Sequence, residues 1–507
     1  MKTAPIAAAC CLFLALVISG CSETSSPPGS ELAFDCLEID GVTTDHASTG
    51  GVSWVDFDGD GDLDLFVTNG YDVSSPQPVS QPNRLYRNEG GGAFSRVTEG
   101  PLANSAGFSS GHTWGDYDND GDLDVFITNQ QDQNNLMFRN EGGEKFVQIK
   151  DVPMVQDGGH SYTAAWVDVD RDGLLDLFVA NGGMSHAGAN RLYRGIGDGN
   201  FARITAGEID TEVASTCGIA WGDYDNDGDA DLFVANQGFS PPANHNALYR
   251  NDGNWKFTRI TDTPVTTDGA PSCTATWVDV DNDLDLDLHV ANMYGMANFL
   301  YLNDGQGGLT PAEVSPLTLD GGHTYGTNWE DYDNDGDLDA VVANWGAGSG
   351  LYLNDGAGKF VRMSGGCLGI RLEYVGAIAS GDFDGDGRLD VYIGSWPNNP
   401  GPGEMNPLFR NQGGENHWLR LRLVGESGSP GGIGARVTVT TSSGTQMREV
   451  TTQTGFRGQS DLAPHFGLGT HETADRVEVR WPSGRTTVQE NVAADQVVEI
   501  RDEAITP

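Results

Sequence analysis

The chain has 507 residues, and its 73 Asp and Glu against 28 Lys and Arg give a formal net charge of -45. That excess of negative charge argues against binding to nucleic-acid phosphates or to anionic lipid headgroups. From residue 416 onward the balance is only -2, so nearly all of the acid lies earlier in the chain. The length suits two or more domains or one large repeat array.

The N-terminus carries an export signal. Lys2 precedes an apolar run over residues 4–18, which is too short to span a membrane and is typical of a secretory signal. The run ends in Ile18-Ser19-Gly20-Cys21, which resembles the lipobox of bacterial lipoproteins; an ordinary signal peptide cut nearby is the alternative. We expect a signal over 1–20, a lipidated Cys21 with its tether over 21–31, and lipid anchoring at a bacterial outer membrane or cell surface.

A nine-residue acidic stretch, Asp56 to Asp64, occurs seven times at intervals of 51 to 60 residues, a period typical of solenoids, propellers and arrays. Each unit has a short strand, the acidic loop, an apolar strand such as 65–67, a third strand such as 84–88, and a fourth strand opened by an aromatic residue such as Phe94. Four antiparallel strands in seven copies predict an all-β fold, a seven-bladed β-propeller; an open array is the alternative.

The spacing also predicts how the ring closes. Each residue that opens a fourth strand stands 22 residues before the next acidic loop, and Phe34 stands 22 residues before Asp56. The seventh unit has a third strand at 408–411 but no fourth strand of its own. We therefore expect residues 34–39 to form the outer strand of the last blade, in a propeller over 32–411 without open sheet edges.

The acidic loop is a candidate calcium site. Side chains at positions 1, 3, 5 and 9 can converge on one cation, Gly at position 6 permits the turn, and position 7 offers its backbone carbonyl, since it is Leu174 in one copy and Arg388 in another. The predicted ligands are Asp56, Asp58, Asp60, Asp62 and Asp64; Asp116, Asp118, Asp120, Asp122 and Asp124; Asp168, Asp170, Asp172, Leu174 and Asp176; Asp223, Asp225, Asp227, Asp229 and Asp231; Asp279, Asp281, Asp283, Asp285 and Asp287; Asp331, Asp333, Asp335, Asp337 and Asp339; and Asp382, Asp384, Asp386, Arg388 and Asp390.

Other identities for this loop fit less well. Position 12 is Val or Ile in every copy, so the loop joins two strands and lacks the Glu of an EF-hand. Magnesium suits a smaller and more rigid set of ligands, and a solvated acidic turn would not need to recur seven times. Up to seven Ca²⁺ ions are expected. The fifth site is doubtful because Leu284 replaces the turn glycine.

With this pattern established, residues 32–411 resemble the FG-GAP/VCBS repeats of integrin α-subunit propellers and of many bacterial surface proteins. The resemblance implies calcium bound in hairpin loops between the first two strands of a blade.

The face opposite the loops collects aromatic and polar residues that could bind a sugar or a peptide. The alternative is structural, with the six Asn thirteen residues after the first Asp capping turns and the aromatics covering loop edges. No Ser/His/Asp set, Cys/His pair or phosphate loop stands out. The candidates for a ligand site are Tyr71, His112, His160, Tyr294, His323, Trp345 and Trp396.

Four cysteines are predicted to lie in two pairs of neighbouring positions in the ring. Cys217 and Cys273 both lie six residues before their loops, on neighbouring inner strands, and Cys36 and Cys367 fall in neighbouring outer positions of the ring. Two disulfides, Cys217–Cys273 and Cys36–Cys367, are one expectation, and buried free thiols are the other.

Residues 412–507 differ from the repeats and alternate as the strands of a small β-rich domain. The segments 432–437, 465–469 and 479–484 resemble the ASPIC/UnbV domain. Joined to FG-GAP/VCBS repeats, this domain makes the chain similar to the cartilage acidic protein family, which has bacterial members; the calcium-binding EGF-like module of its animal members is missing.

These features favour a surface-anchored calcium propeller that acts as a binding or adhesion module for an extracellular glycan or protein, touching the membrane only through its lipid. A calcium-dependent polysaccharide lyase or hydrolase is the first alternative. A scaffold that holds partner proteins through the C-terminal domain is the second.

Overall fold

The computed structural model describes residues 32–502, apart from 45–46, 73–78, 184–185, 239–244, 321, 364–366, 370, 373, 397–405 and 426–430. The predicted signal peptide, Cys21 and its tether lie outside the described residues. Among the helices that are described, none has the length and apolar character needed to cross a membrane.

The described part of residues 32–411 forms seven four-stranded antiparallel sheets. Their inner strands are β2 (Thr49–Val55), β9 (Ser109–Gly115), β13 (Ser161–Val167), β19 (Thr216–Gly222), β23 (Ser272–Val278), β27 (His323–Glu330) and β31 (Val375–Gly381). The second strands are β3 (Asp64–Asn69), β10 (Asp124–Asn129), β14 (Asp176–Asn181), β20 (Asp231–Asn236), β24 (Asp287–Asn292), β28 (Asp339–Trp345) and β32 (Asp390–Ser395).

The third and fourth strands complete each sheet toward the outside. The third strands are β6 (Arg84–Asn88), β11 (Leu136–Asn140), β16 (Arg191–Gly195), β21 (Ala247–Asn251), β25 (Phe299–Leu302), β29 (Gly350–Asn354) and β33 (Leu408–Asn411). The fourth are β7 (Phe94–Val97), β12 (Phe146–Ile149), β17 (Phe201–Ile204), β22 (Phe257–Ile260), β26 (Thr310–Pro311), β30 (Phe360–Arg362) and, for the last sheet, β1 (Phe34–Leu37).

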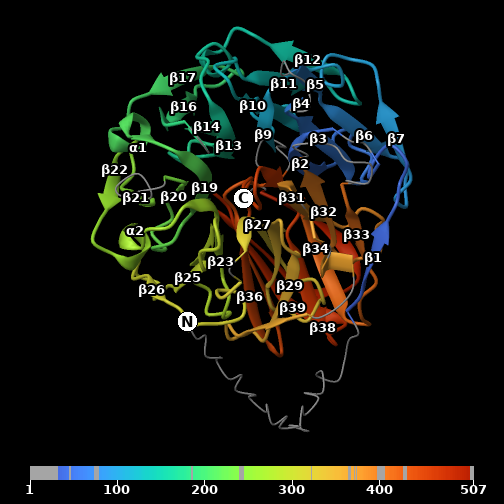
Figure 1. Ribbon diagram of the computed structural model, residues 1–507. Helices are drawn as coiled ribbons and strands as arrows, with labels where there is room; N and C mark the ends of the chain where they lie inside the picture. The colour runs from blue at the N-terminus through green and yellow to red at the C-terminus, as the bar shows by residue number, and fades with distance from the viewer. Residues whose placement is uncertain are drawn as a thin grey trace, which may run out of the picture.

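The sheets close into a ring. Each inner strand contacts the inner strand of the next sheet, and β31 contacts β2 to complete the circle. Figure 1 shows the sheets following one another from blue through green and yellow to orange. The expected closing strand is confirmed, because β1 pairs antiparallel with β33, with Phe34 opposite Asn411. Closure by the N-terminal strand leaves the last sheet with the same four strands as the others.

Aromatic residues pack the sheets against one another. Trp54, two residues before its acidic loop, is buried and stacks on Phe383 of the seventh sheet, with ring centroids 5.8 Å apart. The second strands are buried along their length, apart from the half-buried Trp345 at the end of β28, as strands between two other sheets must be. In the seventh sheet Ser380 stands where the others have Trp, and its hydroxyl lies 2.8 Å from the Tyr332 hydroxyl, so a polar contact replaces the indole there.

Smaller elements connect the strands. Three short strands, β4 (Tyr71–Asp72), β5 (Val79–Pro82) and β8 (Ala106–Gly107), form one sheet, and β15 (Gly188–Ala189) pairs with β18 (Val213–Ala214). The helical turns are η1 (Pro153–Val155), α1 (Glu208–Thr211), α2 (Pro264–Thr267) and η2 (Cys367–Gly369).

Beyond the ring, the chain forms two further sheets. One contains β38 (His465–Gly469), β34 (His417–Val424) and β41 (Gln496–Arg501), and the other contains β36 (Gly444–Glu449), β35 (Arg436–Thr441), β39 (Thr473–Arg480) and β40 (Thr486–Ala493). Their apolar residues, such as Leu421, Val437 and Val477, belong to one buried cluster that continues into propeller residues such as Trp166. The C-terminal sheets therefore share a core with the ring.

One C-terminal strand joins a propeller sheet. Strand β37 (Gly458–Gln459) pairs in parallel with the inner strand β2, with Val52 opposite Gly458 and Ser53 opposite Gln459. It also contacts β9 and β31. Residues 452–461, which we call the plug segment, also form hydrogen bonds with β13 through Thr452 and with β27 and β31 through Ser460. Because inner strands of five sheets surround this segment, it lies inside the central channel.

The plug segment pairs with backbone groups that the inner strands leave free. Trp114 donates its backbone N–H to Gln459 Oε1 at 2.8 Å, and Trp166 donates to Thr452 Oγ1 at 3.1 Å. Ser380 donates to Ser460 Oγ at 3.0 Å. Inner strands are edge strands, so their channel-facing N–H groups need such partners once water is excluded.

The cysteines divide into two kinds. Cys36 and Cys367 form a disulfide with a Cα–Cα distance of 5.7 Å, which joins the closing strand to the turn after the sixth sheet. Cys217 and Cys273 are free and buried, with their Sγ atoms 3.0 Å apart. That separation exceeds the roughly 2.05 Å of a disulfide bond, so the second predicted pairing is absent and the thiol alternative describes this pair.

Candidate functional site

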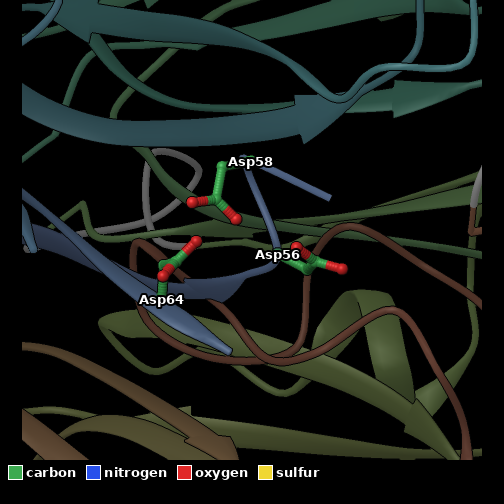
Figure 2. A group of neighbouring side chains, drawn as sticks. All are labelled: Asp56, Asp58 and Asp64. Atoms are coloured by element: carbon green, nitrogen blue, oxygen red, sulfur yellow. The ribbon is translucent and has the colours of Figure 1, made fainter. Parts of the chain in front are cut away.

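Each acidic loop joins the first and second strands of its sheet and gathers carboxylates. In the first loop, ligand atoms of Asp56, Asp58 and Asp64 all lie within 4.8 Å of one another. Figure 2 shows these three side chains gathered around the turn. The same positions, 1, 3 and 9, come together in the loops that begin at Asp116, Asp168, Asp223 and Asp279, and two further such groups exist.

The loops contain buried carboxylate oxygens without a hydrogen-bond partner. At position 3 this holds for Oδ1 in five of the described loops, those of Asp118, Asp170, Asp225, Asp281 and Asp384. A buried anionic oxygen without a partner costs several kcal/mol, and such groups in proteins are paired or coordinate metals. The donor set, hard oxygens from several carboxylates in a flexible loop, fits a cation of the calcium type.

Backbone N–H groups hold the outer carboxylates in place. The N–H of Gly61, at position 6, donates to Asp56 Oδ2 at 3.1 Å, and the N–H of Phe57 donates to Asp64 Oδ2 at 3.2 Å. The other oxygen of Asp64 accepts from the N–H of Asn88 at 2.8 Å. The position 9 carboxylate therefore ties the loop to the third strand of its own sheet.

The Asn that ends a third strand also links neighbouring sheets. Asn88 Nδ2 donates to the carbonyl of Phe383 in the seventh sheet at 2.7 Å, and Asn140 Nδ2 donates to that of Phe57 in the first sheet at 2.8 Å. Equivalent bonds are made by Asn251, Asn303, Asn354 and Asn411. The third sheet has Gly195 at this place, so the amide is missing at its junction with the second sheet.

Burial raises the pKa of the clustered carboxyl groups. Desolvation is the main cause and carries the pKa of Asp64 to about 8 and that of Asp124 to about 9, against the lowering effect of the backbone donors. The pKa of Asp116 is raised to about 7 for the same reason. Neighbouring aspartates add to each shift. Without a cation, part of this acid is therefore protonated near neutral pH.

Positions 5 and 7 behave differently from positions 1, 3 and 9. The carboxylate of Asp60 lies outside the cluster of the first loop and accepts the N–H of Asp62 at 3.0 Å. At position 7, the side chain of Asp337 accepts an amide N–H from Asn282 of the preceding loop at 2.7 Å. The side chain of Asp337 at position 7 thus faces the preceding loop, which suits the expectation that this residue would use its carbonyl.

The fifth loop is strained where the sequence indicated. Leu284 at position 6 has a φ of 72°, in the left-handed region that the other copies reach with glycine. Its N–H still donates to Asp279 Oδ2 at 3.2 Å, as Gly61 does in the first loop. A branched residue in this region costs about 1–2 kcal/mol, so the loop keeps its shape at an energetic cost.

The sixth loop lies beneath the C-terminal sheets. The N–H of Gly467 donates to Asp331 Oδ2 at 2.9 Å, and His465 Nε2 lies 2.7 Å from Asn334 Oδ1. A Cβ on Gly467 would stand 2.2 Å from the same Asp331 oxygen, so only glycine fits this approach. The fourth loop is also contacted, because Arg436 donates to the carbonyl of Asp223 at 2.7 Å. The C-terminal sheets thus dock on the loop face.

On the opposite face the structure revises the ligand candidates. His112 is not on the surface: it is fully buried in β9, its Nε2 lies 2.9 Å from Ser53 Oγ, and burial lowers its pKa to about 3. The repeated Asn residues are structural, as the alternative held; Asn69, for example, is buried and donates its amide to the carbonyl of Pro82 at 2.7 Å. The side chain of Tyr71 lies outside the described residues.

The other candidates are partly exposed, and two groups of them can be followed. His160 stacks on His186 with ring centroids 3.9 Å apart. Tyr294 contacts His323 at 5.2 Å, and His323 contacts Trp345 at 6.0 Å. This places rings from the fifth and sixth sheets side by side at the mouth of the channel.

Two residues of the plug segment reach this mouth, and sequence reasoning missed both. Phe456 packs on Tyr325, 5.3 Å away, and Tyr325 packs on Trp345 at 5.1 Å. The Arg457 guanidinium lies over the ring of Tyr162 at 3.8 Å and near Trp396 at 5.1 Å. We call these rings and the histidines of the preceding paragraph the mouth cluster: His160, Tyr162, His186, Tyr294, His323, Tyr325, Trp345, Trp396 and Phe456. A glycine-flanked Phe-Arg pair outside the repeats was the available signal.

Comparisons with known proteins match both parts of the chain. A family model described as FG-GAP-like repeat matches residues 56–127, 116–179, 168–234, 232–290, 279–342 and 331–393, together well over half of the chain. A second model, described as ASPIC and UnbV, matches residues 425–507.

Individual relatives agree with these matches. Cartilage acidic protein 1 of Mus musculus is 25% identical over 535 residues, covering 95% of this chain and 78% of its own length. The Homo sapiens protein is 27% identical over 332 residues, covering 64% of this chain and 40% of its own. Among solved structures, BBS1N in complex with ARL6DN has a TM-score of 0.43 at 11% identity, covering 75% of this chain and 96% of that one. The chain belongs to the family of FG-GAP repeat proteins that carry an ASPIC/UnbV domain, with homology to cartilage acidic protein 1.

Proposed function

We propose that the protein is an exported, lipid-anchored propeller that is loaded with calcium and binds an extracellular glycan or protein through the face opposite its acidic loops. The observation that carries the calcium part is the set of buried, unpartnered position 3 oxygens, which need a cation or a proton. At millimolar external calcium even weak sites of this kind fill. The observation that supports a ligand on the opposite face is the mouth cluster.

Calcium would act here as a structural ion. It would cancel repulsion among the carboxylates of a loop and tie the first two strands of each sheet together. Each site filled at a hundred times its Kd contributes about 2.7 kcal/mol. Several such sites would make the folded ring strongly dependent on the ion.

Excess chelator tests this proposal. We expect it to lower the melting temperature by more than about 10 °C, measured by circular dichroism, with restoration by Ca²⁺ and less by Mg²⁺. An unchanged melting temperature in chelator would refute the calcium role.

The pH dependence of the stability of the metal-free protein is a second test of the calcium role. Folding raises the pKa of Asp64 to about 8 and of Asp124 to about 9, above their ordinary 3.8, so the folded state holds these protons longer than the unfolded state. In chelator, stability should therefore fall as the pH rises from 5 to 9. With calcium, which needs ionised carboxylates, the stabilisation by the ion should grow over the same range.

A glycan panel tests the binding role. Retention of particular glycans by the calcium-loaded protein, with no new reducing or unsaturated ends, is the expected result. Chain cleavage would instead favour a lyase or hydrolase. The burial of His112 between the first two sheets removes one of the histidines on which that enzyme would have relied.

A further inference from the structure

Arg457 is a buried cation to which the described residues offer no anion. Only 3% of its surface is exposed, and its Nε has no hydrogen-bond partner in that part of the chain. Among the described residues, no carboxylate lies within ion-pair distance of its guanidinium, although the chain carries 73 acidic residues. Burying an uncompensated charge is costly, and the usual solution is a paired acid.

The aromatic rings around Arg457 satisfy only part of its chemistry. Its guanidinium lies 3.8 Å from the centroid of Tyr162, 4.7 Å from Phe456 and 5.1 Å from Trp396. Cation–π contacts of this kind stabilise a desolvated cation. They do not use the five N–H donors of a guanidinium, whose planar fork matches a carboxylate.

The surroundings place this cation where a ligand could arrive. Tyr162 is the second residue of β13 and Trp396 follows the end of β32, so both stand at the mouth opposite the acidic loops. The exposed fraction differs among the rings of the mouth cluster: Phe456 is 1% exposed, Trp396 is half-buried and Tyr294 is 40% exposed. Among the described rings that contact Arg457, Trp396 is therefore the one that also reaches solvent.

We propose that Arg457 binds the carboxylate of an acidic sugar, a uronate residue of a glycan, whose C–H face stacks on the half-buried ring of Trp396 beside it. A carboxylate supplies the bidentate acceptor that the guanidinium lacks, and a sugar ring suits aromatic partners. The inference rests on the proposed function in locating the ligand at this face, and it adds the ligand class and the residue that selects it.

The test compares a uronate with its neutral ester on the calcium-loaded full chain. Trigalacturonic acid should bind in isothermal titration calorimetry, and its trimethyl ester should bind at least tenfold more weakly. Arg457→Met should lose the preference for the acid. Arg371→Met, which removes an exposed positive charge, should keep it.

Controls separate a ligand role from a packing role. Arg457→Met should retain the calcium-dependent shift in melting temperature, since the acidic loops are untouched. If Arg457→Met fails to fold, Arg457→Lys serves in its place, because lysine keeps the positive charge but lacks the planar set of N–H donors. This variant should bind the acid three- to tenfold more weakly than the unchanged chain does, at the same melting temperature.

Other outcomes overturn the inference. Equal binding of acid and ester, or binding of the acid that survives in Arg457→Met, would show that the guanidinium does not select a carboxylate. Preferential binding of a tripeptide with a free C-terminus would replace the sugar by a peptide ligand. Retention of neutral glycans with no preference for the acid would leave the proposed function standing and remove this inference alone.

Discussion

The acidic loops and the plug segment hold the same ring together in opposite ways. The loops occur seven times, and each ties the strands of its own sheet, as Asp64 does through Phe57 and Asn88. The plug segment occurs once and bonds to the inner strands of five sheets. The contacts that hold each blade together are thus repeated in every sheet, whereas the contacts at the centre of the ring come from a single segment that does not repeat.

The largest effect is expected from breaking the plug segment. A Cβ on Gly458 would stand 2.0 Å from the carbonyl oxygen of Ile378, so Gly458→Val cannot pair with β2 without displacing the seventh sheet. We expect a loss of more than about 4 kcal/mol in the free energy of unfolding, measured by urea denaturation in calcium.

A glycine with open surroundings provides the control for that substitution. A Cβ on Gly444 meets nothing within 4 Å, so Gly444→Val should change stability by less than about 0.5 kcal/mol. Similar small losses in both variants would show that the plug segment is not needed to hold the ring.

Substitutions in two copies of the loop should cause intermediate losses of stability that differ in size. Asp333→Asn removes a ligand from the sixth loop, which lies under the C-terminal sheets, and Asp58→Asn removes the equivalent ligand from the more open first loop. Losing one site costs about 2.7 kcal/mol at a hundred times its Kd. We expect the larger loss for Asp333→Asn, because the contact between Asp331 and Gly467 is disturbed as well.

Two measurements distinguish Asp333→Asn from Asp58→Asn. Melting temperature in calcium reports the loss at each site, and limited proteolysis within 412–502 reports release of the C-terminal sheets. Equal melting temperatures and equal proteolysis would mean that the sixth loop and the C-terminal sheets are independent of one another.

The smallest effect concerns the one loop without a turn glycine. Leu284→Gly relieves a left-handed backbone at φ 72° but makes the unfolded chain more flexible. We expect a net gain of about 0.5–1 kcal/mol and tighter calcium binding at the fifth site, measured by calorimetric titration. A loss of stability would show that the leucine side chain contributes more by packing than its backbone costs.

Sequence reasoning succeeded where a pattern repeats. Equal spacing from each fourth-strand residue to the next loop located the closing strand at Phe34. The backbone role at position 7, inferred from Leu174 and Arg388, stays a prediction. Sequence reasoning failed for His112, because a histidine near the start of an inner strand can face a neighbouring sheet as readily as solvent. It also failed for Cys217 and Cys273, where equivalent positions on adjacent strands bring two thiols close without requiring a bond.

The ring of sheets and the acidic loops follow from the sequence alone, because a carboxylate cluster with a turn glycine is encoded within nine consecutive residues and is repeated. Which loop lies under Gly467, and which residues complete the mouth cluster, depends on contacts made in the folded molecule. Phe456 and Arg457 meet Tyr325 and Tyr162 across more than a hundred residues of chain. A single-copy contact between distant segments leaves no period or spacing in the sequence, so folding alone brings these groups together.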